Sequence, residues 1–216
     1  LLPGGTAFMD GFDPRGDLHI RRNRLPHWEQ AGATYFLTFR LADALPEVLL
    51  QPWREDRDRW RLAHPLPWSA EEETAYHRLF SAKIDGWVDA GHGFCLLRCP
   101  ACAQAVVETL QHDDLRRVEH HAIVVMPNHL HALFSLISAT ALPALVRAWK
   151  GVSARRLNAL RQRTGPLWQR DYFDRLIRDE EHFRRCLRYN RSNPAKAKLH
   201  ECDYVRYESK LAKSIA

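Results

Sequence analysis

Two apolar segments joined by a two-residue turn constrain the fold of this chain more than any other feature. Residues 118–126 contain the apolar run Ile123-Val124-Val125, residues 129–136 follow, and Pro127-Asn128 stands between the two segments. Apolar, β-branched runs of this length favour strands, and a Pro-Asn pair favours a tight turn. The pattern therefore predicts a β-hairpin, and with it an antiparallel sheet.

The rest of the chain mixes strand and helix patterns. A further strand is expected at residues 34–41, which are rich in β-branched and aromatic side chains. The expected helices cover residues 47–63, 70–89, 101–112, 141–162 and 179–192. Because strands and helices follow one another without strict alternation, we predict one α+β domain with a central antiparallel β-sheet flanked by α-helices.

Composition excludes several classes of protein. The 216 residues are 45% hydrophobic, which is enough for one domain with a proper core. No apolar run approaches the roughly 20 residues that span a bilayer, so no membrane partner is expected. The five cysteines are an odd number and suit a soluble, intracellular protein with reduced thiols. Cys99 and Cys102, with Cys95 nearby, would allow a zinc site, but a helix start at Pro100 explains the segment better, and we assign it no function.

Positive charge is concentrated in one third of the chain. The whole chain carries a formal charge of +6. Residues 147–191 hold thirteen Lys or Arg and five Asp or Glu, a net charge of +8. The aromatic residues among them are Trp149, Trp168, Tyr172, Phe173 and Tyr189. Cations suit phosphates and flat rings suit unpaired bases, so the stretch indicates a nucleic-acid surface. A solvated basic face is the alternative.

Two histidines occupy alternate positions of one predicted strand. Side chains alternate between the faces of a sheet, so His129 and His131 share one face while Leu130 points to the other. Two imidazoles directed at one point favour a divalent metal site. A purely structural role for the pair remains the alternative.

The helix expected at residues 179–192 carries a tyrosine beside its apolar stripe. That stripe consists of Phe183, Cys186 and Leu187. At 100° per residue Tyr189 lies on the flank of the stripe, on one line with His182, Arg185 and Asn193. This position suits a side chain that meets a phosphate, although a half-packed structural tyrosine would show the same pattern.

Three motifs together resemble a known family. Residues 125–131 (Val-Met-Pro-Asn-His-Leu-His) look like the metal-binding segment of the HUH single-tyrosine transposases. Residues 168–175 (Trp-Gln-Arg-Asp-Tyr-Phe-Asp-Arg) and 177–181 (Ile-Arg-Asp-Glu-Glu) resemble the segment that precedes the catalytic helix of the REP-associated tyrosine transposases. Tyr189 followed by Asn193-Pro194 is similar to that group's ending. The resemblance covers roughly residues 25–200.

The resemblance implies a ferredoxin- or RRM-like HUH core and a set of boundaries. We expect an N-terminal arm at residues 1–24, a transposase domain at residues 25–204 and a C-terminal tail at residues 205–216. One departure concerns Asn190 and Arg191, which follow the tyrosine where relatives usually have at least one apolar residue. This difference affects the packing expected at the end of the helix.

The resemblance also implies a reaction and a cofactor. His129 and His131 would bind Mg²⁺ or Mn²⁺, with Asn193 as third ligand. Tyr189 would attack a phosphate of single-stranded or hairpin DNA and form a covalent 5′-phosphotyrosine, with the metal and the surrounding arginines favouring the phenolate. The side chains expected to hold the DNA backbone include Lys150, Arg155, Arg156, Arg178 and Arg185. Tyr172 is a rival nucleophile of lower rank.

Two other functions stay open at this point. The chain would act as a water-using metal-dependent nuclease if Tyr189 formed no covalent bond, or as a catalytically idle module that binds hairpin DNA. The joint presence of His129, His131, Tyr189 and Asn193 speaks against the idle module. For the transposase we expect a monomer or homodimer in the cytoplasm of a prokaryotic cell, acting at the nucleoid.

Overall fold

A five-stranded antiparallel sheet forms the centre of the protein. The computed structural model describes residues 19–22, 26–30, 32–65, 68–137 and 140–215. In spatial order the strands are β6 (Phe173–Leu176), β3 (Thr34–Arg40), β5 (His129–Leu136), β4 (Val118–Val125) and β7 (Val205–Glu208). β4 and β5 pair as the expected hairpin. The sheet order was not predicted, since β6 and β7 were not recognised as strands.

The five expected helices are present, but a π-helical turn divides the one at residues 70–89, and α7 was not predicted. They are α1 (Glu47–Ala63), α2 (Ala70–Tyr76), α3 (Ala82–Asp89), α4 (Pro100–Gln111), α5 (Leu142–Leu160), α6 (Glu180–Lys196) and α7 (Lys210–Ser214). A π-helical turn, η1 (His77–Ser81), joins α2 to α3, and two short 3-10 helices are η2 (Leu96–Arg98) and η3 (Glu201–Asp203). α6 begins after Asp179, whose carboxylate accepts a hydrogen bond from the His182 amide at 2.6 Å. It continues past Pro194 and ends at Lys196, four residues beyond the expected end at residue 192.

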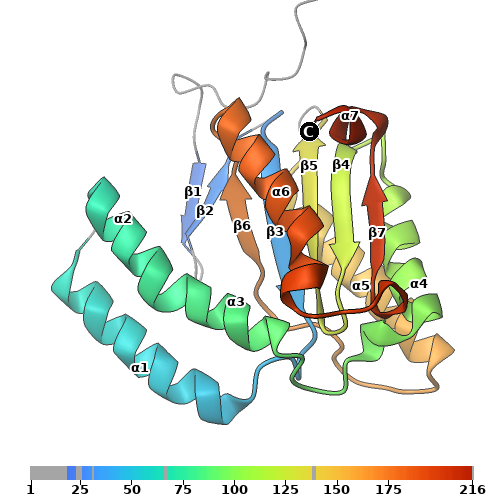
Figure 1. Cartoon of the computed structure of the whole chain (residues 1–216), viewed down its shortest axis with the longest axis horizontal. Helices are drawn as coiled ribbons and strands as arrows, with labels where there is room; N and C mark the ends of the chain where they lie inside the picture. Colours follow the sequence, from blue (N-terminus) through green and yellow to red (C-terminus); the bar gives the residue numbers. More distant parts are fainter. Residues whose placement is uncertain (1–18, 23–25, 31, 66–67, 138–139, 216) are drawn as a thin grey trace, which may run out of the picture.

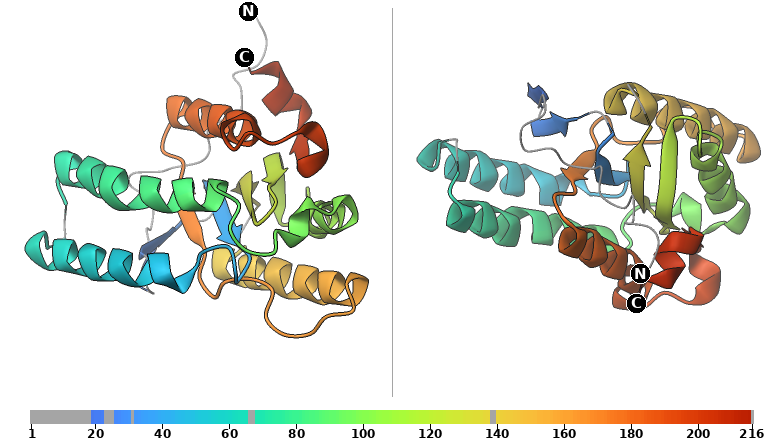
Figure 2. Two further views of the ribbon diagram at one scale, coloured as in Figure 1. Left: turned by 60° about the horizontal axis from the view of Figure 1, so that its bottom comes forward. Right: turned by 90° about the horizontal axis from the view of Figure 1, so that it is seen from above.

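Helices cover both faces of the sheet, which confirms the predicted α+β class. α4 and α5 lie on one face and α6 on the other, as two directions of view agree (Figures 1 and 2). The larger core, between the sheet and α4 and α5, includes Tyr35, Leu37 and Phe39 of β3. The smaller core, under α6, includes Phe36 and Leu133. The alternation of side chains along each strand therefore supplies both layers.

The segment from α1 to α3 forms a helical arm beside the sheet. α1 and α3 run side by side away from the edge that carries β6 (Figures 1 and 2). Leu45, Ile84 and Val88 form a small core of their own, with Trp53 packed against it. A hydrogen bond holds the C-terminal end of α3 next to the β4–β5 turn: the Asn128 side chain donates to the Val88 carbonyl at 3.1 Å.

Both ends of the chain differ from the boundaries expected from sequence. Of the expected arm at residues 1–24, residues 19–22 form β1 (His19–Arg22), which pairs with β2 (Pro26–Glu29). Residues 1–18, 23 and 24 lie outside the described residues. The tail expected at residues 205–216 is wrong as a boundary: β7 pairs with β4, and Ala212 of α7 is fully buried under α6. The exposed edge of β4 needs a partner, and residues 205–208 supply it.

Within the described ranges, no helix is long and apolar enough to cross a membrane.

Candidate active site

His129 and His131 lie on the same face of β5, the face covered by α6. The apolar neighbours Leu130 and Ala132 point into the opposite core, as the alternation predicted. Both histidines are buried, and their Nε2 atoms are 3.1 Å apart. The strand pairing places His131 opposite Thr38 of β3.

The other ring nitrogen of each histidine is held by a hydrogen-bond partner. Nδ1 of His129 lies 2.8 Å from Oδ1 of Asn128, and Nδ1 of His131 lies 2.6 Å from the Thr38 hydroxyl. The Asn128 amide is itself fixed, because its Nδ2 donates to the carbonyls of Val88 and His92 at 3.1 and 3.0 Å. Partners at Nδ1 fix the orientation of a histidine ring and leave Nε2 for a ligand, as is usual in metal sites.

The two Nε2 atoms fit a single divalent cation. Nitrogens bound to one ion at about 2.1 Å lie about 3.0 to 3.4 Å apart when the angle is between 90° and tetrahedral. Burial, with a smaller contribution from Arg40, lowers the pKa of His131 to about 3, and burial also holds the pKa of His129 well below its ordinary value. Both imidazoles are therefore neutral near pH 7, as ligands must be. Among the described residues no three His, Cys, Asp or Glu side chains form a metal-binding group, so a third ligand would be of another type.

Asn193 has the properties of such a ligand. It is fully buried on α6, one turn after Tyr189, and neither its Oδ1 nor its Nδ2 has a hydrogen-bond partner in the described part of the chain. Buried side-chain amides normally have hydrogen-bond partners, so two amide atoms without any indicate a partner from outside the chain, such as a metal ion. Asn190 is buried in the same unsatisfied state. Asn190 is one of the two residues after Tyr189 where relatives usually have at least one apolar residue, and the sequence did not indicate that its amide lacks partners.

Tyr189 packs directly against His131. Its ring meets that of His131 edge-on, with centroids 5.2 Å apart, and that of Phe36 in the same way at 5.7 Å. The ammonium of Lys196 lies 5.2 Å from the centre of the tyrosine ring. The tyrosine ring is thus held against His131, whose Nε2 lies 3.1 Å from that of His129.

The electrostatics of the phenol differ from what the sequence suggested. Burial, followed by the charges of Asp85 and Asp89, raises the pKa of Tyr189 above its ordinary value, while Arg175 lowers it. An arginine does act in the expected direction, but burial and the two carboxylates outweigh it. In the metal-free protein the phenol stays protonated, and a cation beside it would be needed to reverse this.

The two carboxylates on α3 were not identified from sequence. Oδ1 of Asp89 lies 3.9 Å from Nε2 of His129, and Asp85 borders the pocket beside Tyr189. Burial and the neighbouring charge of Asp85 raise the pKa of Asp89 to about 6. Their spacing of four residues on the helix expected at residues 70–89 places them on one face, but only the packing of the helical arm against the sheet directs that face at His129.

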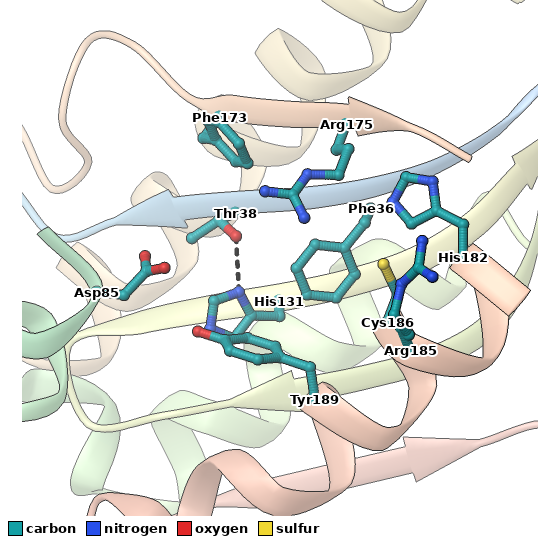
Figure 3. Close-up of a pocket in the computed structure, with 10 residues that line it drawn as sticks. All are labelled: Phe36, Thr38, Asp85, His131, Phe173, Arg175, His182, Arg185, Cys186 and Tyr189. Atoms are coloured by element: carbon teal, nitrogen blue, oxygen red, sulfur yellow. Dashed lines mark hydrogen bonds between the residues drawn. The ribbon is translucent and has the colours of Figure 1, made fainter. Parts of the chain in front are cut away.

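A pocket of about 250 Å³ opens in front of Tyr189. Figure 3 shows Asp85 and Phe173 at one end of it, His182 and Arg185 at the other, and the guanidinium of Arg175 between the two ends. Three of the four residues predicted on one line of α6, namely His182, Arg185 and Tyr189, are therefore found on one wall, whereas Asn193 is fully buried and does not border the pocket. Arg175 was not singled out, because β6, which carries it, was not recognised as a strand.

The five arginine and lysine side chains expected to bind DNA fall into two groups. Arg178 and Arg185 lie on the side of α6, and Arg185 borders the pocket. Lys150, Arg155 and Arg156 belong to α5, on the opposite face of the sheet (Figure 2). The structure therefore does not bring this second group to the histidine pair.

Two of the α5 cations serve the fold. Lys150 donates to the carbonyl oxygens of Gln169 and Arg170 at 2.5 and 2.8 Å, and burial lowers its pKa to about 8. Arg156 joins α5 to α4 through the Ala105 carbonyl and the Thr109 hydroxyl, both at 3.0 Å. Their donors are engaged within the protein, and their expected contact with DNA stays a prediction. Arg155 is exposed on the same helix.

Two aromatic residues considered from sequence belong to the larger core. Trp149 is 1% exposed and donates to Asp113 at 2.9 Å, so it is a core residue and does not stack on a base. Tyr172, the rival nucleophile, packs against the core on the α4–α5 face. Tyr189 is the tyrosine that contacts His131.

Comparisons with known proteins agree with the motifs. Residues 102–190 match the family model described as IS200-like transposase. This segment contains His129, His131 and Tyr189, and the match confirms the resemblance that these residues indicated. No curated protein sequence matches the chain.

Two solved structures are similar in outline. One is a REP-associated tyrosine transposase bound to a REP hairpin, with 16% identity, a TM-score of 0.46, and coverage of 81% of this chain and 74% of that chain. The other, from Deinococcus radiodurans R1, is described as a presumed transposase, with 16% identity, a TM-score of 0.30, and coverage of 84% of this chain and 96% of that chain.

Proposed function

We propose that this protein is a metal-dependent transposase that cuts and rejoins single-stranded DNA at hairpin ends, with Tyr189 as its nucleophile. The observation that carries the proposal is the contact between the Tyr189 ring and His131, whose Nε2 lies 3.1 Å from that of His129. A buried, oriented histidine pair beside a tyrosine, at the wall of a pocket with arginines, is the combination that such chemistry needs.

His129 and His131 would hold Mg²⁺ or Mn²⁺ through their Nε2 atoms, with Asn193 as the third protein ligand. The orphaned amide of Asn193 and the hydrogen bonds at both Nδ1 atoms support this assignment. When bound, a divalent cation supplies charge withdrawal at a phosphate oxygen and favours the phenolate of a neighbouring tyrosine. Because all three proposed ligands are neutral, they would leave the full charge of the ion for the substrate.

The reaction of Tyr189 exchanges one phosphate ester for another. The phenol oxygen forms a bond to phosphorus, the bond between phosphorus and the 3′-oxygen breaks, and the DNA on the 3′ side stays attached through a 5′-phosphotyrosine. The phenol proton is lost to solvent and the departing 3′-oxygen takes one up. The step therefore consumes no net proton and needs no nucleotide cofactor. Attack by another 3′-hydroxyl reverses the step and rejoins strands, which distinguishes this chemistry from hydrolysis.

The test is covalent capture of labelled DNA. A library of single-stranded hairpins labelled on the 3′ side is incubated with the protein and Mn²⁺ and resolved on a denaturing protein gel. We expect labelled protein with the wild type and none with Tyr189→Phe, which should still bind the DNA. Residual cleavage by Tyr189→Phe would refute the tyrosine mechanism and favour a water-using nuclease. Binding without any cleavage by the wild type would favour the idle module.

A further inference from the structure

The arginines around α6 divide into paired and unpaired groups. Arg184 and Arg188 bond to glutamates of the first turn of their own helix, and Arg191 bonds to Glu208 of β7. Among the described residues, the guanidinium groups of Arg185 and of Arg175 on β6 have no hydrogen-bond or ion-pair partner. Their donors are available for an anion from outside the protein.

Both unpaired guanidinium groups border the pocket beside Tyr189. Arg175 extends over the middle of the pocket, and Arg185 lies at the end away from Asp85 (Figure 3). The volume of about 250 Å³ is below the roughly 300 to 1,000 Å³ that is usual for sites of drug-sized ligands. The pocket is therefore no larger than a single nucleotide requires, and it leaves no room for a base pair.

An aromatic ring lies at one end of the same pocket (Figure 3). Phe173 is partly exposed, and the guanidinium carbon of Arg175 lies 5.6 Å from the centre of its ring. Phe36, the other phenylalanine of the pocket, is buried and already packs against His131 and Tyr189. Phe173, beside the Arg175 guanidinium, is therefore the ring of the pocket that can stack on an unpaired base.

We propose that this pocket binds one unpaired nucleotide next to the phosphate that Tyr189 attacks, with its own phosphate between Arg175 and Arg185 and its base on Phe173. The inference rests on the proposed function, since Tyr189 defines which phosphate is attacked. It deepens that function by assigning the side chains that hold the unpaired nucleotide beside the attacked phosphate, without any contact that depends on its sequence. A duplex does not fit, because its bases are stacked and paired.

Equilibrium binding without metal tests the pocket separately from the chemistry. The probe is a fluorescein-labelled single strand of mixed sequence, measured by anisotropy in EDTA over a series of salt concentrations, so that nothing is cleaved. We expect Arg175→Gln and Arg185→Gln each to weaken binding about 10-fold or more. Each should also reduce the slope of log affinity against log salt by about 0.7 if one phosphate contact is lost.

Arg184→Gln is the matched control, because Arg184 adjoins Arg185 but bonds to Glu180 outside the pocket. It should change affinity little. Equal losses in Arg184→Gln and Arg185→Gln, or equal losses for single-stranded and duplex probes, would overturn the proposal in favour of a diffuse basic surface. Arg175→Lys keeps the positive charge but removes the planar guanidinium, which can donate two parallel hydrogen bonds to a phosphate. Binding as tight as that of the wild type would overturn a specific guanidinium contact.

Phe173 is tested with an abasic nucleotide moved along a hairpin substrate. At one position next to the cleavage site, removal of the base should weaken binding about 5-fold or more in the wild type and have no further effect in Phe173→Leu. Equal effects in both proteins would exclude stacking on Phe173. If these binding results hold while the wild type forms no covalent product with Mn²⁺, the proposed function fails and the nucleotide pocket stands. If covalent capture succeeds while the arginine variants bind normally, the pocket fails and the proposed function stands.

Discussion

We expect the Asn193→Ala variant to be at least as stable as the wild type without metal and less stable than the wild type with metal. In the metal-free protein Asn193 buries two amide atoms that have no partner. An unsatisfied buried polar group costs about 1 to 3 kcal/mol, and its removal leaves a small cavity that costs about 1 kcal/mol. The metal-free variant should therefore equal the wild type or exceed it by up to about 2 kcal/mol.

Metal should invert this difference. If Asn193 is a ligand, Mn²⁺ at about a hundred times its dissociation constant stabilises the wild type by about 2.7 kcal/mol, and the variant gains far less at the same concentration. For a domain of this size 1 kcal/mol corresponds to about 2 to 4 °C in Tm. The wild type should then melt about 5 to 10 °C higher with Mn²⁺ than without it, whereas the variant should hardly respond.

The assay is thermal unfolding by circular dichroism, with EDTA and with a titration of Mn²⁺. Asn190→Ala is the control, because Asn190 is equally buried and unsatisfied on the same helix. It should gain stability in EDTA and keep the response to Mn²⁺. A full Mn²⁺ response in Asn193→Ala, or its loss only in Asn190→Ala, would refute the assignment of Asn193.

Three further predictions concern other parts of the structure. Burial holds the pKa of His131 at about 3 and that of His121 at about 4, below the 6.5 of an ordinary histidine. As the pH falls below 6.5, these two side chains therefore become protonated in the unfolded chain while they stay neutral in the folded protein. Metal-free stability should therefore fall by about 1.4 kcal/mol per pH unit for each of them below pH 6.5, and flat urea-unfolding stability from pH 7 to 5 would contradict this. Asp89→Asn removes a carboxylate 3.9 Å from His129 and should weaken Mn²⁺ binding about 10-fold in calorimetry; unchanged affinity would show that Asp89 does not act on the ion. Arg156→Ala should lower the free energy of unfolding by about 1 to 3 kcal/mol, because bonds to α4 are lost, while anisotropy shows unchanged DNA affinity; weaker binding by a folded variant would restore its expected role in DNA contact.

Much of the site was predictable because its signals are local in the sequence. The two-residue period of a strand was enough to place His129 and His131 on one face, and the helical period was enough to align His182, Arg185 and Tyr189. Both patterns hold in the structure, where His131 and the three residues of α6 border one pocket. Periodicity gives the face of an element, since that follows from backbone geometry alone.

The same reasoning failed where the outcome depends on which elements pack together. Lys150 and Arg156 have the composition of DNA-binding residues, but α5 lies on the far face of the sheet, where their donors bind protein carbonyls. The short strands β6 and β7 lack a clear pattern and are stable only as partners of β3 and β4. Residues 205–208 therefore looked like a tail.

What the sequence determined by itself is the β-hairpin, the α+β class and the two imidazoles on one face of a strand, while the resemblance added the proposed roles of the phenol and the amide. Only the tertiary structure decided which cations face the phenol and which carboxylates stand beside the histidines. Asp89 comes within 3.9 Å of His129 from a segment forty residues away in the chain. That proximity comes from the packing of the helical arm against the sheet. The periodicity of a helix or strand predicts which residues share a face, but not which distant segment that face will contact.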